Sequence, residues 1–115
     1  MSIYGLTTGS VVVLHILFFV LESILWTSPV VMRIFGNTEL NAKATRVVAL
    51  NQGFYNLGAA GLLGAFLALQ NTEAVAGMLF FIIAMGIVGA ITANWRIILI
   101  QSLPALLALG ALFGS

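Results

Sequence analysis

The stretch AVAGMLFFIIAMGIVGAITA, residues 74–93, decides the class of this fold because none of its side chains is charged. An α-helix rises about 1.5 Å per residue, so about 20 apolar residues cross the roughly 30 Å hydrocarbon core of a bilayer. This stretch therefore predicts a transmembrane helix.

The composition of the whole chain points the same way. Of its 115 residues, 62% are hydrophobic and 6% are charged, against about 45–50% and about 25% in soluble domains. So few charges cannot cover the surface of a soluble domain, and a net charge of +1 gives no reason to expect a nucleic acid partner. The absence of cysteine excludes disulfides, thiolate nucleophiles and cysteine-bound metals. We expect no metal and no cofactor.

Three further apolar windows flank residues 74–93, so we predict an all-α integral membrane protein, an antiparallel bundle of four transmembrane helices in one domain, residues 1–115. The predicted spans are Leu6–Trp26, Arg46–Leu69, Ala74–Ala93 and Ile97–Phe113. The connections at 71–73 and 94–96 are short enough to make neighbouring helices antiparallel. A cleaved signal peptide is the less favoured interpretation of the first span, because no Lys or Arg precedes it.

The connection between the first and second spans carries helix signals of its own. Ser28 and Pro29 suit the N-cap and the first position of a short helix, and Gly36 suits its C-terminal end. Asn37 or Thr38 is then expected to cap the second span. We predict one short interfacial helix here, with an irregular loop as the alternative.

The basic residues indicate an orientation. Arg33, Lys43 and Arg46 lie in or beside the first connection and Arg96 in the third, whereas the second connection has Glu73. The positive-inside rule places the basic loops in the cytoplasm and both termini outside. We therefore expect a multi-pass protein whose main partner is the lipid bilayer.

Several polar side chains fall inside the predicted spans. From the rise per residue, Glu22, Gln52 and Gln101 lie about 6–8 Å below one interface, and His15 and Asn56 lie about 13–17 Å deep. Polar groups within spans face a bundle interior or a wet cavity. We predict a polar pocket on the cytoplasmic side. Its candidate residues are Glu22, Asn51, Gln52, Tyr55, Asn56, Gln101, His15, Trp26, Asn94 and Arg96.

These residues also have structural alternatives. Asn and Gln side chains in spans often only join neighbouring helices, at about 0.6 kcal/mol per hydrogen bond, and Tyr55 and Trp26 suit an interfacial belt. A lone His15 is more often a donor between helices than a metal ligand. Glu22 differs because a carboxylate in low dielectric is costly, so it is either protonated or paired with an arginine or a ligand.

Small residues and proline indicate where helices approach or bend. Gly61 and Gly86 each have an alanine four residues further on, a spacing that lets helix backbones pack closely. Pro104 lacks the N–H that would bond to a carbonyl in the preceding turn, which predicts a kink just beyond Gln101.

Several separated motifs are shared with a known family. They are HILFFVLESILWTSP at 15–29, FG at 35–36, ALNQGFYNLGAAGL at 49–62, GAIT at 89–92 and QSLPALLAL at 101–109. In these the chain resembles the small bacterial membrane proteins catalogued as domain of unknown function 1304. The resemblance implies a bacterial inner membrane location and no particular activity, and the epimerase label of some members matches no chemistry in these residues. The family's basic run before the Phe-Gly pair is reduced here to Arg33, which disfavours an anionic ligand in that loop.

Three functions stay open from the sequence. The favoured one is binding or transport of a small molecule or ion, in a homo-oligomer because 115 residues make half a transporter at most. The second is an integral membrane enzyme that acts on a lipid or hydrophobic metabolite, with Glu22 and His15 as an acid–base pair. The third is a structural accessory subunit whose polar residues only fix helix pairing.

Overall fold

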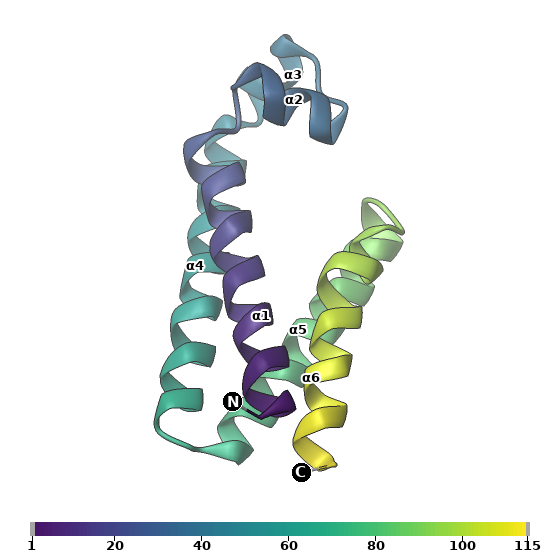
Figure 1. Cartoon of the computed structure of the whole chain (residues 1–115). Coiled ribbons are helices and arrows are strands. Elements are labelled where there is room, and N and C mark those ends of the chain that lie inside the picture. The colour runs from purple at the N-terminus through teal and green to yellow at the C-terminus, as the bar shows by residue number, and fades with distance from the viewer. Residues whose placement is uncertain (1, 115) are drawn as a thin grey trace. The chain divides into compact units, whose positions relative to one another are not determined.

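The computed structural model of the chain describes residues 2–114, and the regular elements in that range are all helices. They are α1 (Ile3–Phe19), which continues as the π-helix η1 (Val20–Ile24), then α2 (Pro29–Phe35), α3 (Glu39–Ala44), α4 (Arg46–Ala68), α5 (Thr72–Thr92), the π-helix η2 (Ile98–Ser102) and α6 (Leu103–Phe113) (Figure 1). The predicted all-helical class is confirmed. The four long helical stretches begin and end close to the ends of the predicted spans.

The chain divides into two compact units. The first unit is residues 14–60, which hold the end of α1, η1, α2, α3 and the first part of α4. The second unit is residues 1–13 together with 61–115. The prediction of a single domain stays a prediction.

In the first unit, the end of α1 with η1 runs antiparallel to the start of α4. Trp26 bonds to Thr45, and Ser23 bonds to the Leu50 carbonyl, so a lower residue number on one helix faces a higher one on the other. The rings of Phe19 and Phe54 continue this order, edge to face with centroids 5.2 Å apart.

The connection at the end of this pair begins with α2, as the sequence predicts. The Ser28 hydroxyl accepts a hydrogen bond from the Val31 N–H at 3.3 Å, and Pro29 takes the first helical position. Gly36 ends the helix at φ 67°, in the left-handed region where a glycine has no side chain to clash.

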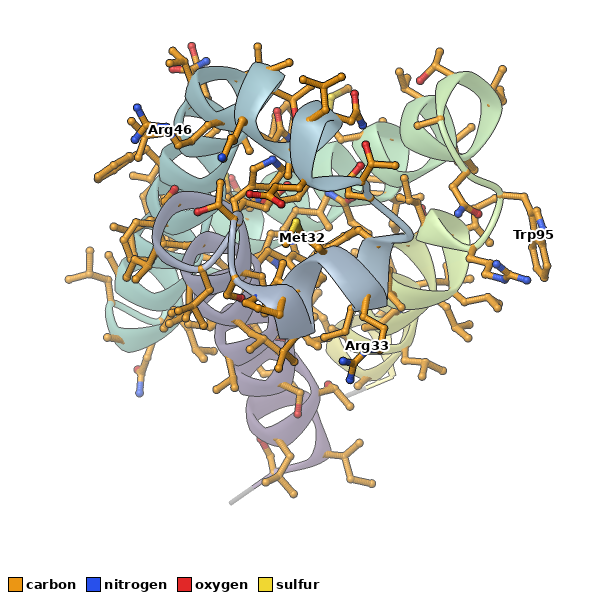
Figure 2. The ribbon with its side chains drawn as sticks, turned by 90° about the horizontal axis from the view of Figure 1, so that it is seen from above. Met32, Arg33, Arg46 and Trp95 are labelled. Atoms are coloured by element: carbon orange, nitrogen blue, oxygen red, sulfur yellow. The ribbon has the colours of Figure 1, made fainter. Side chains whose placement is uncertain are left out.

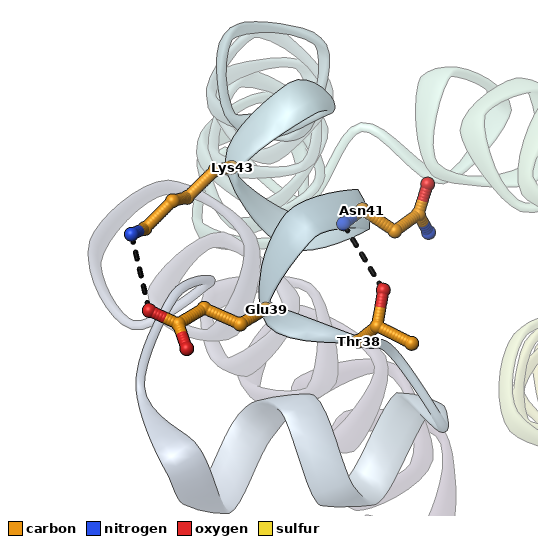
Figure 3. Close-up of polar contacts among 4 residues, drawn as sticks. All are labelled: Thr38, Glu39, Asn41 and Lys43. Atoms are coloured by element: carbon orange, nitrogen blue, oxygen red, sulfur yellow. Dashed lines mark hydrogen bonds and ion pairs between the residues drawn. The ribbon is translucent and has the colours of Figure 1, made fainter.

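A second short helix, α3, follows α2, so the prediction of one interfacial helix was incomplete. Thr38 Oγ1 accepts from the Asn41 N–H at 3.1 Å and caps α3, not the second long helix (Figure 3). An exposed ion pair of 3.0 Å joins Lys43 to Glu39 along the same helix. Such pairs contribute about 0.3–0.5 kcal/mol.

Thr45 separates α3 from α4. Its backbone leaves the helical region at φ −101° and ψ 6°. Its hydroxyl donates to the Asn41 carbonyl at 2.8 Å and accepts from Trp26 Nε1 at 3.1 Å, so the break is tied to the end of the first long helical stretch. The predicted start of the second long helix at Arg46 is confirmed.

In the second unit, α5 packs against η2 and α6 through an apolar core. The buried core residues of this unit are Val11, Leu63, Val75, Leu79, Ile82, Ala105, Ala108 and Leu109. The turn between α4 and α5 is tight because Gln70 adopts φ 57° and the Asn71 side chain accepts from the Ala74 N–H at 3.1 Å.

Two helices among residues 2–114 are long and apolar enough to cross a membrane by length and composition, Ile3–Ile24 and Thr72–Thr92. Ile98–Phe113 is apolar but shorter. In the most apolar window of Thr72–Thr92, 22% of the residues are buried, whereas the core helix of a soluble protein is mostly buried. This gives weak support to a membrane location, and the four spans stay a prediction.

Candidate functional site

Glu22 lies in the π-helix η1, which packs against α4 in the first unit. The Leu25 N–H bonds at 3.0 Å to the Val20 carbonyl, five residues earlier instead of four. One extra residue in the turn rotates the helix on one side of it by about 100° relative to the other side. Single π-turns occur frequently at functional sites.

Glu22 bonds across this pair to Asn56 of α4. The Asn56 side-chain amide donates to Glu22 Oε1 at 2.6 Å, and both side chains are half-buried. Glu22 forms no ion pair with a basic side chain anywhere in residues 2–114. The carboxylate therefore has one amide donor, and its second oxygen has no hydrogen-bond donor from this part of the chain.

This pairing differs from the predicted depths. The sequence analysis put Glu22 level with Gln52 and put Asn56 deeper, with His15. In the structure Glu22 bonds to Asn56, one turn beyond Gln52 on α4, whereas Ser23 bonds to the carbonyl of Leu50, just before Asn51 and Gln52. A helical rise measured from each predicted helix end does not fix how two helices align.

Ser23 holds the two helices close together at this level. Its hydroxyl donates to the Leu50 carbonyl at 2.8 Å. A Cβ added at Gly53 would overlap Ser23 Oγ and would lie 3.0 Å from the Ser23 backbone nitrogen. Gly53 is therefore the residue that allows η1 to approach α4, and neither Ser23 nor Gly53 was among the predicted site residues.

The other predicted residues of α4 lie on its surface. Asn51 and Gln52 are exposed, and Tyr55 is 72% exposed. None of the three forms a side-chain hydrogen bond within residues 2–114. Of the predicted site residues on this helix, the structure brings only Asn56 to Glu22.

His15 and Trp26 both make aromatic contacts in the first unit. His15 is 2% exposed, and its ring meets Phe18 edge to face with centroids 5.1 Å apart. Trp26 bonds to Thr45 and lies against the Phe35 ring at 5.2 Å. Both side chains are used in packing here.

Gln101, Asn94 and Arg96 belong to the second unit. Asn94 Oδ1 accepts from the Arg96 N–H at 3.0 Å, a turn between helices, and the Arg96 guanidinium lies 5.6 Å from the centre of the Trp95 ring, which is exposed (Figure 2). Gln101 lies in η2, half-buried, with no side-chain hydrogen bond to the described residues.

The second unit repeats the serine contact of the first. The Ser102 hydroxyl, at the end of η2, donates to the Ile83 carbonyl at 2.9 Å, and a Cβ added at Gly86 would overlap Ser102 Oγ. The predicted close approach at Gly86 is thus confirmed, whereas a Cβ at Gly61 meets nothing within 4 Å. The π-helix η2 ends two residues before Pro104. The kink predicted just beyond Gln101 stays a prediction.

A pocket of about 140 Å³ opens beside the Ser23 contact. Its walls are Ser23, Ile24, Trp26, Thr27, Arg46, Val47 and Leu50. Trp26 is the predicted site residue among them, and Arg46, whose side chain extends away from the ribbon, supplies the charge (Figure 2). Within residues 2–114 there is no group of three or more His, Asp or Glu side chains that could hold a metal ion.

The fold and the site define a small, apolar, all-helical protein whose half-buried carboxylate bonds to an amide on the facing helix. The chain belongs to the family described as proteins of unknown function (DUF1304), which matches residues 9–113. The resemblance drawn from the sequence is thereby confirmed.

A curated protein is similar to this chain over most of its length. The chain is 33% identical over 93 residues to the uncharacterized protein YpaA of Lactococcus lactis subsp. lactis (strain IL1403). The alignment covers 77% of this chain and 78% of the relative. No solved structure matches the chain significantly.

Proposed function

We propose that this protein is a small multi-pass membrane protein that binds a monovalent cation, a metal ion or an ammonium group, at Glu22. The four long helical stretches then cross the bilayer, the basic connections face the cytoplasm, and both termini lie outside. The contact between Glu22 and Asn56 is the observation that carries the proposal.

The case for binding rests on the chemistry of a carboxylate in this position. Packing two helices through hydrogen bonds needs only neutral amides, each worth about 0.6 kcal/mol in a membrane. Inserting an ionisable side chain into a span costs about 2.5–3.5 kcal/mol of free energy on insertion scales, several times what one such bond contributes. Since Glu22 has a single amide donor from residues 2–114, a ligand donor or cation at its second oxygen would offset that cost.

The chemistry of the pair also restricts the ligand. Asn56 donates its amide N–H to Glu22, so the carboxylate Oε2 and the Asn56 carbonyl oxygen are the acceptors left over. Both accept hydrogen bonds or coordinate hard cations. Since the pair offers a single negative charge, the ligand class is a monovalent cation, either a metal ion or an ammonium group, and an anion is disfavoured.

The enzyme alternative receives less support. It needs His15 to reach a substrate shared with Glu22, yet His15 is 2% exposed and packs against Phe18. A general acid or base must come within hydrogen-bond reach of the atom it serves. No observation favours this reading over ligand binding.

A titration of purified protein tests the proposal. Trp26 lies one turn from Glu22, so its fluorescence in a Trp95→Phe background reports on the site. Sodium, potassium and ethylammonium chlorides are added at constant ionic strength to the protein in detergent. We expect a saturable change with at least one of them that is about 10- to 150-fold weaker in Glu22→Gln, because a hydrogen bond to a charged group contributes about 1.5–3 kcal/mol.

Glu73→Gln is the matched control. Glu73 is also a glutamate, but it is exposed in the first turn of α5. It should leave the titration unchanged. The proposal is overturned if none of the three cations gives a saturable signal, or if Glu22→Gln and Glu73→Gln behave alike.

A further inference from the structure

The two units contain the same helix contact, and only one copy carries the candidate site. In each, a serine in a π-helical turn donates its hydroxyl to the carbonyl three residues before a glycine on the facing helix. The pairs are Ser23 with Gly53 and Ser102 with Gly86, and the accepting carbonyls belong to Leu50 and Ile83. The facing helices are antiparallel in both copies.

The residues around the two serines correspond in sequence as well. Glu22 precedes Ser23, and Gln101 precedes Ser102. Three residues after the glycine, the first copy has Asn56 and the second has Gly89. The second copy therefore keeps the serine, the glycine and the π-turn and lacks the carboxylate–amide bond.

The contact constrains the turn that bears Glu22. A π-turn is less favourable than continuous α-helix and persists where its surroundings hold it. Removing its extra residue would rotate the flanking segments by about 100° relative to each other. The Ser23 backbone nitrogen comes within 3.0 Å of the position a Gly53 Cβ would take, so the turn lies directly on α4.

We propose that Ser23 and Gly53 are positioning residues for Glu22: their contact fixes the π-helical turn, and the turn holds the carboxylate at Asn56. Ser102 and Gly86 form the same contact as packing alone. This inference rests on the proposed function, because positioning Glu22 affects ligand affinity only if Glu22 binds the ligand.

The test reads position and binding separately. Protein labelled with ¹⁵N-asparagine shows the side-chain amide of Asn56, assigned by its loss in Asn56→Ala. Gly53→Ala and Ser23→Ala should move this resonance away from its hydrogen-bonded position and weaken the cation titration of Trp26 fluorescence about tenfold. The first variant fills the contact space, and the second removes only the hydroxyl.

Gly86→Ala and Ser102→Ala are the matched controls, since they disturb the same contact in the other copy. They should leave the Asn56 resonance and the titration as in the wild type. The inference is overturned if Gly53→Ala and Ser23→Ala leave the Asn56 resonance in place, or if the two control variants move it equally. If Gly53→Ala does not fold, Ser23→Ala decides by the same criteria.

The two claims fail in different ways. If the wild type gives no saturable titration, the proposed function is wrong, whatever the Asn56 resonance does. If the wild type binds a cation with loss in Glu22→Gln, but Ser23→Ala changes neither readout, the positioning role is wrong and the binding site stands.

Discussion

Asn56 donates its side-chain amide to Oε1 of Glu22 at 2.6 Å, a bond between residues 34 apart in sequence and on facing helices. Ser23 also bonds across these two helices, to the Leu50 carbonyl, but the bond to Asn56 involves the ionisable Glu22. Its energetic role can be separated from its role in ligand binding.

Asn56→Ala should destabilise the protein because it leaves a half-buried carboxylate without its donor. The expected loss is about 1–3 kcal/mol in the free energy of unfolding, measured by denaturation in mixed detergent micelles. Asn51→Ala is the control, since Asn51 is exposed with no side-chain hydrogen bond in the described chain. Equal losses in the two variants would show that the amide bond contributes nothing specific.

Gly86→Ala should also destabilise the protein, since the new Cβ would overlap Ser102 Oγ. Overpacking of this kind costs about 1–3 kcal/mol. Gly77→Ala, in the same helix, meets nothing within 4 Å and should be neutral or stabilising, because alanine favours helix over glycine. Thermal denaturation of the two variants side by side checks this difference, and a Gly86→Ala protein as stable as Gly77→Ala would contradict the contact.

Thr45→Val should loosen the junction between α3 and α4. The substitution keeps the shape of the side chain but removes the hydroxyl that bonds to Trp26 Nε1 and to the Asn41 carbonyl. We expect faster amide hydrogen exchange in residues 39–45 than in the wild type, with exchange in α5 unchanged. Thr92→Val, which removes an exposed hydroxyl bonded within its own helix, is the control. Equal exchange rates in residues 39–45 of the two variants would show that the Thr45 hydroxyl does not hold the junction together.

The orientation can be tested with single cysteines because the chain has none of its own. Lys43→Cys and Asn94→Cys should react with a membrane-impermeant maleimide only after the cells are opened, since their connections are assigned to the cytoplasm. Thr72→Cys should react in intact cells. Labelling of all three from outside, or of none in opened membranes, would contradict the proposed topology.

Much of the fold can be predicted from apolar runs and capping residues. The long helices follow from runs of uncharged residues, and α2 follows from Ser28, Pro29 and Gly36 because caps act within a few residues of sequence. Thr38 was recognised as a cap, but the helix it begins ends at Thr45, whose partner Trp26 is 19 residues away. A break held by such a distant contact leaves no local sequence signal.

The contact between Glu22 and Asn56 follows from the sequence only in part. Glu22 and Asn56 were both candidates because polar residues within apolar helices are costly. Their pairing was missed since a rise measured from each predicted helix end does not fix how two helices align, and residues 20–24 form a π-helix that the sequence analysis did not predict. The role of Ser23 and Gly53 could not be predicted, because the parallel between Glu22-Ser23 and Gln101-Ser102 is recognised only once the structure shows both serine contacts.

The central claim is that Glu22 accepts the ligand, and carboxyl ¹³C NMR tests it most directly. The acidic residues of this chain are Glu22, Glu39 and Glu73, so protein labelled with ¹³Cδ-glutamate gives three carboxyl resonances, with Glu22 assigned by Glu22→Gln. On titration with the cation that changes Trp26 fluorescence, we predict that the Glu22 resonance shifts and saturates while those of Glu39 and Glu73 stay in place. A Glu22 resonance that stays fixed, or that moves only as much as the other two, would contradict the account.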